Sequence, residues 1–139
     1  MQAKEYLMQY QRQQRLIVNR IAERDRWNSI ATGVSASISI DKVFSSSGTG
    51  ERMADAVCEI ADLDTEITEA IKKAMEIERD IVKRIEALPV EEYDLLHKLY
   101  IQRVPFGDLP RVLNKSKRTV ARLHGSALKR IQASLDADA

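Results

Sequence analysis

Residues 51–88 read ERMADAVCEIADLDTEITEAIKKAMEIERDIVKRIEAL, and the spacing of their apolar side chains decides the fold. Seam positions recur at alternating steps of four and three residues, as in a coiled coil of about five heptads. The pattern predicts a helix over residues 51–87, roughly 55 Å long, which cannot form a compact core alone. The predicted seam, with charged interruptions at Asp64 and Glu78, is Met53, Val57, Ile60, Asp64, Ile67, Ile71, Ala74, Glu78, Ile81, Ile85 and Leu88.

A second long helix is predicted over residues 2–34, where apolar side chains also recur at three- and four-residue steps. Residues 1–34 carry six basic and three acidic side chains, a balance of +3, whereas residues 51–87 carry six basic and eleven acidic ones, a balance of −5. Similar lengths and opposite charges predict an antiparallel hairpin within one chain. A parallel coiled coil between two chains is the alternative that the sequence leaves open. The predicted stripe of the first helix is Leu7, Tyr10, Ile17, Ile21 and Ala31, with Leu16, Trp27 and Ile30 on its shoulders.

The segment between these helices, residues 35–50, reads SASISIDKVFSSSGTG and loses the helical period. Its Ser and Gly content predicts a long connection. Residues 37–40 alternate like a strand, but the chain offers no evident strand to pair with them. Residues 48–50, Gly-Thr-Gly, lack the Gly-Lys-Ser/Thr ending of a phosphate-binding loop, which argues against nucleotide binding.

The composition bounds the class of protein. Of 139 residues, 44% are hydrophobic and only 5% aromatic, which favours an all-α fold. Cys58 is the single cysteine, so no internal disulfide can form. No apolar run approaches the roughly 20 residues of a membrane span, and we expect a cytoplasmic protein, in a bacterial host cell, without membrane contact. No histidine accompanies Cys58 or falls in the two long helices, so we expect neither an enzyme nor a metal or other cofactor.

A separate C-terminal domain is predicted over residues 88–135. Pro89 ends the long helix, because proline restricts the residue before it and suits a first helical turn. The helix that follows is broken by residues 104–107, VPFG. Its predicted buried face is Tyr93, Leu96, Leu99 and Tyr100.

The end of this domain has the pattern of a helix-turn-helix. A short helix is predicted over residues 108–113, followed by a tight corner at residues 114–115. Ser116 is a favourable N-cap for a last helix over residues 117–134. The predicted core positions of that helix are Val120, Leu123, Ala127 and Ile131.

Charge is segregated in the same region. Residues 109–135 carry seven basic and no acidic side chains, a local balance of +7 in a chain of net charge +1. Helix N-termini attract phosphate, and long basic side chains reach both phosphates and guanine edges, so we expect double-stranded DNA as a partner. An ordinary solvated basic face is the alternative. The predicted DNA-binding residues are Arg111, Lys115, Ser116, Lys117, Arg118, Thr119, Arg122 and Lys129.

The C-terminal third resembles region 4 of sigma-70-type factors. The residues that carry this likeness are Leu88-Pro89, Leu95-Leu96, Tyr100, Leu109, Leu113, Ser116, Thr119-Val120, Arg122-Leu123-His124 and Ala127-Leu128-Lys129-Arg130. Pro110 stands where that family usually has alanine, so the short helix is expected to begin near Gly107 or Asp108. The chain has no room for the other regions of a complete sigma factor.

The whole chain is similar to phage and prophage late-gene transcriptional regulators of the ArpU and RinA type. The residues concerned are 2–7 (QAKEYL), 53–57 (MADAV) and 123–128 (LHGSAL). This resemblance implies a phage-encoded transcription regulator, with RNA polymerase as a possible partner and a homodimer as a possible state. Two alternatives remain: a DNA-packaging protein resembling a small terminase subunit, and a structural or inhibitory protein whose basic face is incidental.

Overall fold

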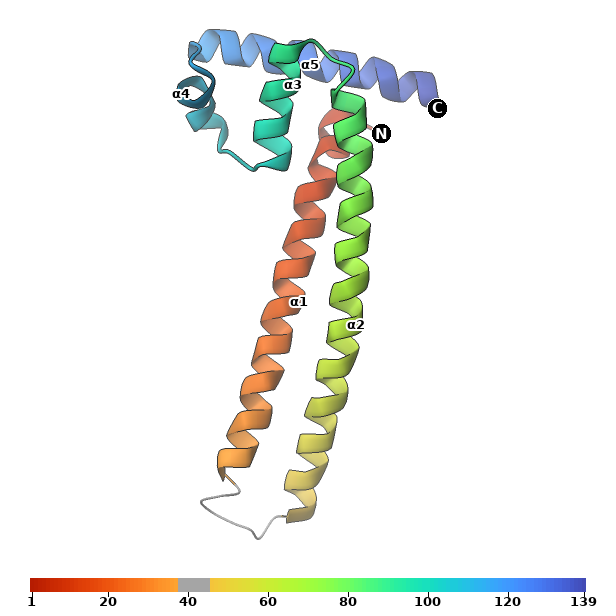
Figure 1. Cartoon of the computed structure of the whole chain (residues 1–139), viewed down its shortest axis with the longest axis vertical. Coiled ribbons are helices and arrows are strands. Elements are labelled where there is room, and N and C mark those ends of the chain that lie inside the picture. Colours follow the sequence, from red (N-terminus) through yellow and green to blue (C-terminus); the bar gives the residue numbers. More distant parts are fainter. Residues whose placement is uncertain (38–45) are drawn as a thin grey trace. The chain divides into compact units, whose positions relative to one another are not determined.

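A computed structural model describes residues 1–37 and 46–139 of the chain, and every regular element in these ranges is helical (Figure 1). Two compact units can be distinguished. Residues 15–72 form the hairpin unit, and residues 1–14 together with 73–139 form the C-terminal unit. The helices are α1 (Ala3–Ser37), α2 (Ser46–Ile85), α3 (Val90–Leu96), the π-helix η3 (His97–Ile101), the 3-10 helix η4 (Phe106–Asp108), α4 (Leu109–Leu113) and α5 (Lys117–Asp138).

The predicted pair of long helices is confirmed, with different ends. Helix α1 continues to Ser37, and α2 begins at Ser46, inside the segment predicted as the connection. Most of the strand-like stretch therefore lies outside the described residues. The predicted domain boundary after residue 87 also differs from the division observed, because both ends of the hairpin share one core with the C-terminal helices.

Within the hairpin unit, α1 and α2 run antiparallel. Arg20 pairs with Glu66, and one turn later along α1, Arg24 pairs with Asp64, which lies earlier in α2. The Arg24 Nη1 and Asp64 Oδ1 atoms are 3.1 Å apart. Opposite charges on the two helices thus meet within one chain, as the charge balances predicted.

The predicted seam of α2 is wrong at Val57, Asp64 and Ile71. Val57 and Ile71 are 59% and 42% exposed, and Asp64 lies at the surface as an ion-pair partner instead of interrupting an apolar contact. After Met53, Ile60 and Ile67, the next buried residue follows at three residues instead of four. This brings Ala and Leu inward and leaves the Asp64 carboxylate exposed to water. Small alanines also allow a close approach of helices. The buried positions of α2 are Ala56, Leu63, Ile67, Ala70, Ala74, Ile81 and Ile85.

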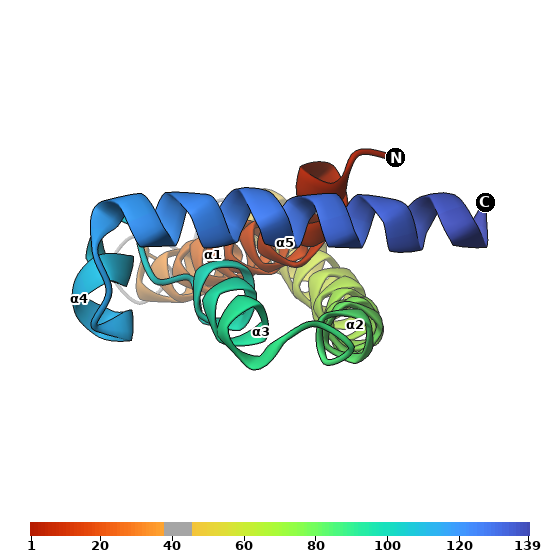
Figure 2. The same cartoon turned by 90° about the horizontal axis from the view of Figure 1, so that it is seen from above.

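The core of the C-terminal unit contains residues from both long helices and from the C-terminal helices. Helix α5 crosses α3 and buries the four residues predicted for it (Figure 2). Leu7 of α1 and Ile85 of α2 are fully buried in the same cluster. The buried members are Ala3, Tyr6, Leu7, Ile81, Ile85, Leu95, Leu96, Tyr100, Ile101, Leu109, Val120, Leu123, Ala127 and Ile131.

The helix after Pro89 is not uniform. It is an α-helix up to Leu96 and a π-helix from His97 to Ile101, and the wider turn displaces the buried face. Tyr100 and Ile101 are buried, whereas Leu99 is only half-buried. Arg103, with a φ of 62°, reverses the chain in a left-handed conformation where glycine is the usual residue.

Among residues 1–37 and 46–139, no helix combines the length and the apolar character that crossing a membrane requires.

Candidate nucleic-acid interface

The corner between α4 and α5 is built by local hydrogen bonding. Asn114 adopts the left-handed conformation (φ 55°, ψ 47°), which asparagine tolerates better than most residues. Ser116 is the N-cap of α5, and its Oγ accepts a hydrogen bond from the backbone N–H of Thr119 at 3.1 Å. Pro110 lies in the first turn of α4, where its missing N–H has no partner to lose. The sequence therefore fixes where α4 ends and where α5 begins.

Four cations of α5 point away from the protein. Val120, Leu123, Ala127 and Ile131 bury one face of the helix, so residues on the opposite face must be exposed. Among the residues that the structure describes, no acidic side chain forms an ion pair with any of these cations. The four exposed cations are Lys117, Arg118, Arg122 and Lys129.

The other basic side chains of this region have acidic neighbours. Lys115 Nζ is 3.2 Å from Glu91 Oε1, and Arg111 Nη2 is 4.0 Å from Asp108 Oδ2. The side chain of Lys115 is 27% exposed, against 77% for Arg111. The predicted DNA-binding residues thus divide into cations that are free and cations, above all Lys115, whose charge is already partly neutralised.

Glu92 is a buried acid that sequence reasoning missed. Only 4% of the residue is exposed, and its Oε1 accepts a hydrogen bond from Ser126 Oγ at 2.6 Å. Arg130 Nε lies 3.1 Å from its Oε2. Glu92 therefore fixes α5 on α3 and neutralises one of the seven basic charges. No sequence signal in residues 109–135 indicates this partner, because the run contains no acid.

His124 anchors the same helix on the other side. Its Nε2 is 2.8 Å from the Tyr100 hydroxyl, and the Phe106 ring meets it edge-on at a centroid distance of 5.4 Å. Burial lowers the pKa of His124, and the nearby charge of Lys4 lowers it further. Burial raises the pKa of the Tyr100 hydroxyl to about 12. His124 is therefore a packing residue between α5 and the segment that contains Tyr100 and Phe106.

The C-terminal half of α5 is fastened to both long helices. Arg84 of α2 donates to Ser134 and Asp138 of α5, and its Nε donates to the Tyr6 hydroxyl at 3.1 Å. Burial, followed by the hydrogen bond to Asp80, raises the pKa of Tyr6 to about 12. These contacts join the C-terminal half of α5 to α2, and through Arg84 to Tyr6 of α1.

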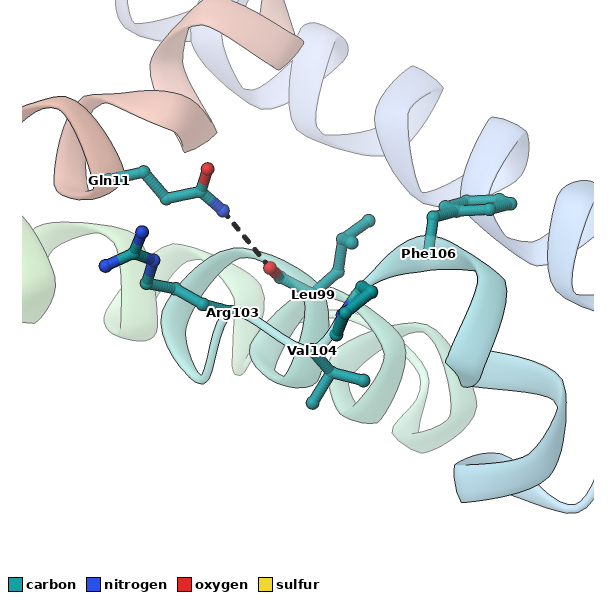
Figure 3. A pocket seen from close by; sticks show the side chains of 6 residues that line it. Gln11, Leu99, Arg103, Val104 and Phe106 are labelled. Atoms are coloured by element: carbon teal, nitrogen blue, oxygen red, sulfur yellow. Dashed lines mark hydrogen bonds between the residues drawn. The ribbon is translucent and has the colours of Figure 1, made fainter.

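One cavity of the C-terminal unit lies beside Arg103 (Figure 3). Its volume is about 260 Å³, and Gln11 Nε2 donates to the Leu99 carbonyl at its wall. Val104 and Phe106 supply apolar surface. Arg103 is the one ionisable residue among its walls, so the cavity holds no acid–base pair for catalysis.

Metal-binding clusters are also absent from the described ranges: no group of three His, Cys, Asp or Glu side chains comes together in residues 1–37 and 46–139. Cys58 is exposed on α2.

Comparison of the chain with protein-family models, with curated proteins and with solved structures finds no match.

Proposed function

We propose that this protein is a sequence-specific, DNA-binding transcription regulator of phage or prophage origin that acts in the cytoplasm of a bacterial host. The observation that carries the proposal is the set of exposed cations without acidic partners on α5, directly after a capped corner. Helix α4, the corner and α5 have the order and lengths of a helix-turn-helix, in which the second helix enters the major groove. The resemblance to sigma-70 region 4 and to late-gene regulators supports the same conclusion. The proposal assigns no catalytic activity.

Each side chain has a separate role in this proposal. Arg122 offers a bidentate fork to guanine, worth on the order of 1–3 kcal/mol of base discrimination. Lys117 and Arg118 reach the groove or its phosphates, and Ser116 with Thr119 sets the start of the helix. Arg111 contributes salt-sensitive phosphate affinity. Lys115 contributes least, because it must first leave Glu91.

The hairpin unit is proposed as the protein-binding part. It exposes apolar side chains at Val18, Val57 and Ile71, which a second copy of the chain or RNA polymerase could cover. A homodimer would match the two-fold operators that helix-turn-helix proteins commonly read.

A binding titration tests the proposal. The affinities of wild type, Arg122→Ala and Lys115→Ala are measured at two salt concentrations. One duplex is a genomic fragment selected by binding to the wild-type protein, and the other has the same composition in scrambled order. Arg122→Ala should weaken the selected fragment more than the scrambled one, whereas Lys115→Ala should change both little and equally. Unchanged affinity in Arg122→Ala, with circular dichroism showing a folded chain, would refute the assignment of this face.

Sequencing of genomic fragments bound by the wild-type protein separates the functional classes. Promoter-proximal fragments support transcription regulation. Enrichment of a single packaging site instead supports the terminase-like alternative, and the absence of any enrichment overturns both.

A further inference from the structure

Gly125 lies on the outward face of α5, and no contact within the chain accounts for a glycine at this position. Arg118, Arg122, Gly125 and Lys129 follow at steps of four, three and four residues, so they lie one above another on the side opposite the core. Glycine in a helix interior destabilises the helix relative to alanine. Gly125 is in the middle of the longest helix of the C-terminal segment, between two cations without acidic partners.

Neither packing nor backbone conformation requires glycine at this position. A Cβ atom built on Gly125 meets no heavy atom within 4 Å outside its own helix. None of the described glycines has a positive φ, so Gly125 has an ordinary helical backbone. The space that glycine leaves is therefore open to another molecule.

This open face has a defined end. Gln132, which follows Gly125 on the same side of the helix, accepts a hydrogen bond from the Ala3 N–H at 2.8 Å and donates to the Met1 carbonyl at 3.2 Å. The N-terminus of the chain thus lies against α5 at this point (Figure 2). The free part of the face reaches from Arg118 to Lys129, roughly 16 Å at 1.5 Å per residue.

We propose that one sugar–phosphate strand of the bound DNA crosses α5 at Gly125, between Arg122 and Lys129, and approaches the helix backbone closely. This inference rests on the proposed DNA-binding function and adds a second contact point, distant from the start of α5. A length of roughly 16 Å exceeds the major-groove width of about 12 Å, so a helix that crosses the groove meets a phosphate strand before its free face ends. Because Gly125 has no side chain, a phosphate can approach the helix backbone there, and Lys129 then binds that phosphate. Charge complementarity favours this occupant, because all ionisable residues of the free part of the face, from Arg118 to Lys129, are cations.

The test is a graded series at Gly125. Gly125→Ala and Gly125→Leu add one carbon and then a full side chain, and both replace glycine with a better helix former. The melting temperature should stay the same or rise, while affinity for a short fluorescein-labelled duplex of mixed sequence falls, on the order of tenfold for the leucine variant. Ala133→Leu is the matched control, because it places the same leucine side chain at an exposed position of α5 beyond Gln132. Lys129→Ala should reduce the salt dependence of binding by about one phosphate contact.

The outcomes separate this inference from the proposed function. Failure of the wild-type chain to bind any duplex would overturn both. Binding that is weakened by Arg122→Ala but unchanged in both Gly125 variants would overturn the crossing at Gly125 alone. Loss of a dimer in light scattering of Gly125→Leu, at unchanged DNA affinity, would also overturn it and would assign the face to a helix of a second copy.

Discussion

The two units of this protein are stabilised in different ways along the same two helices. In the C-terminal unit, α1 and α2 contribute Leu7, Ile81 and Ile85, each no more than 1% exposed, to a core shared with α3 and α5. In the hairpin unit, the described side chains of α1 are half-buried or exposed, and the buried residues of α2 are Ala56, Leu63, Ile67 and Ala70. Ion pairs such as Arg24–Asp64 border that contact.

This difference shows where the free energy of unfolding resides. Fully buried aliphatic side chains stabilise a fold by about 1.5–3 kcal/mol each, whereas exposed ion pairs contribute about 0–1 kcal/mol. The C-terminal unit therefore carries most of the stability and holds the candidate DNA-binding face. The hairpin unit contributes less to the free energy of unfolding, so a rearrangement of this unit would cost less free energy.

The largest change in stability is expected for Ile81→Ala, and Ile71→Ala on the same helix is its comparison. Ile81→Ala should lower the free energy of unfolding by about 2–5 kcal/mol, because it leaves a cavity in the core of the C-terminal unit. Ile71→Ala should change it by less than about 0.5 kcal/mol, because Ile71 is 42% exposed and alanine is the better helix former. Urea denaturation followed by circular dichroism measures both.

Trp27, the single tryptophan, allows unfolding of the hairpin unit to be followed separately in both isoleucine variants. It lies half-buried in the hairpin unit, so its fluorescence reports on that unit while circular dichroism reports on the whole chain. Equal losses in the two isoleucine variants would contradict the observed burial and restore the seam predicted from the sequence.

The seam error shows what periodicity can and cannot determine. Steps of four and three residues predicted both long helices, and their lengths and charge balances predicted their pairing. The steps do not determine the seam, because Val57 or Ala56, and Ile71 or Ala70, fit the same average period. The choice depends on what the partner helix presents, and here small side chains are placed inward. Local signals were more reliable: Ser116 caps α5, because a serine cap depends on neighbouring backbone alone.

The basic residues of the candidate site could be predicted from the sequence, but the acidic residues that pair with two of them could not. The run without acids identified all seven basic residues, and the core positions of α5 indicated which of them face outward. Sequence could not show that Glu91 and Glu92, from another helix, pair with Lys115 and Arg130. Nor does any sequence period predict the π-helical turn that changes the buried face after Leu96.

Removal of the cap should have the next largest effect. Ser116→Ala should destabilise the C-terminal unit by about 1 kcal/mol, since the Thr119 N–H loses its acceptor. Ser116→Asn should restore most of that loss. Thermal denaturation of the three proteins at one protein concentration provides the measurement, and an unaffected alanine variant would mean that the corner is held by Asn114 alone.

A smaller effect is expected from pH, because His124 is only half-buried. Its pKa in the folded chain lies below the ordinary value of 6.5, so the unfolded chain binds the proton more tightly. The stabilising contribution is present above pH 6.5 and is lost as the pH falls below that value. The Tyr100 hydroxyl and the Phe106 ring contact the His124 ring, and the charge of Lys4 lies nearby. The free energy of unfolding should decrease from about pH 7.5 to 5.5, and less steeply in His124→Gln.

The smallest effect is expected in the hairpin unit, from the pair of Arg24 and Asp64. Their side chains are 33% and 55% exposed, so water screens the attraction and their coupling should be about 0.2–1 kcal/mol. A double-mutant cycle with Arg24→Ala and Asp64→Ala, followed by Trp27 fluorescence in urea, measures the coupling, which should decrease further in high salt. A coupling above about 2 kcal/mol would show that ion pairs, and not the C-terminal core, stabilise the hairpin. That result would remove the difference between the two units from which these expectations derive.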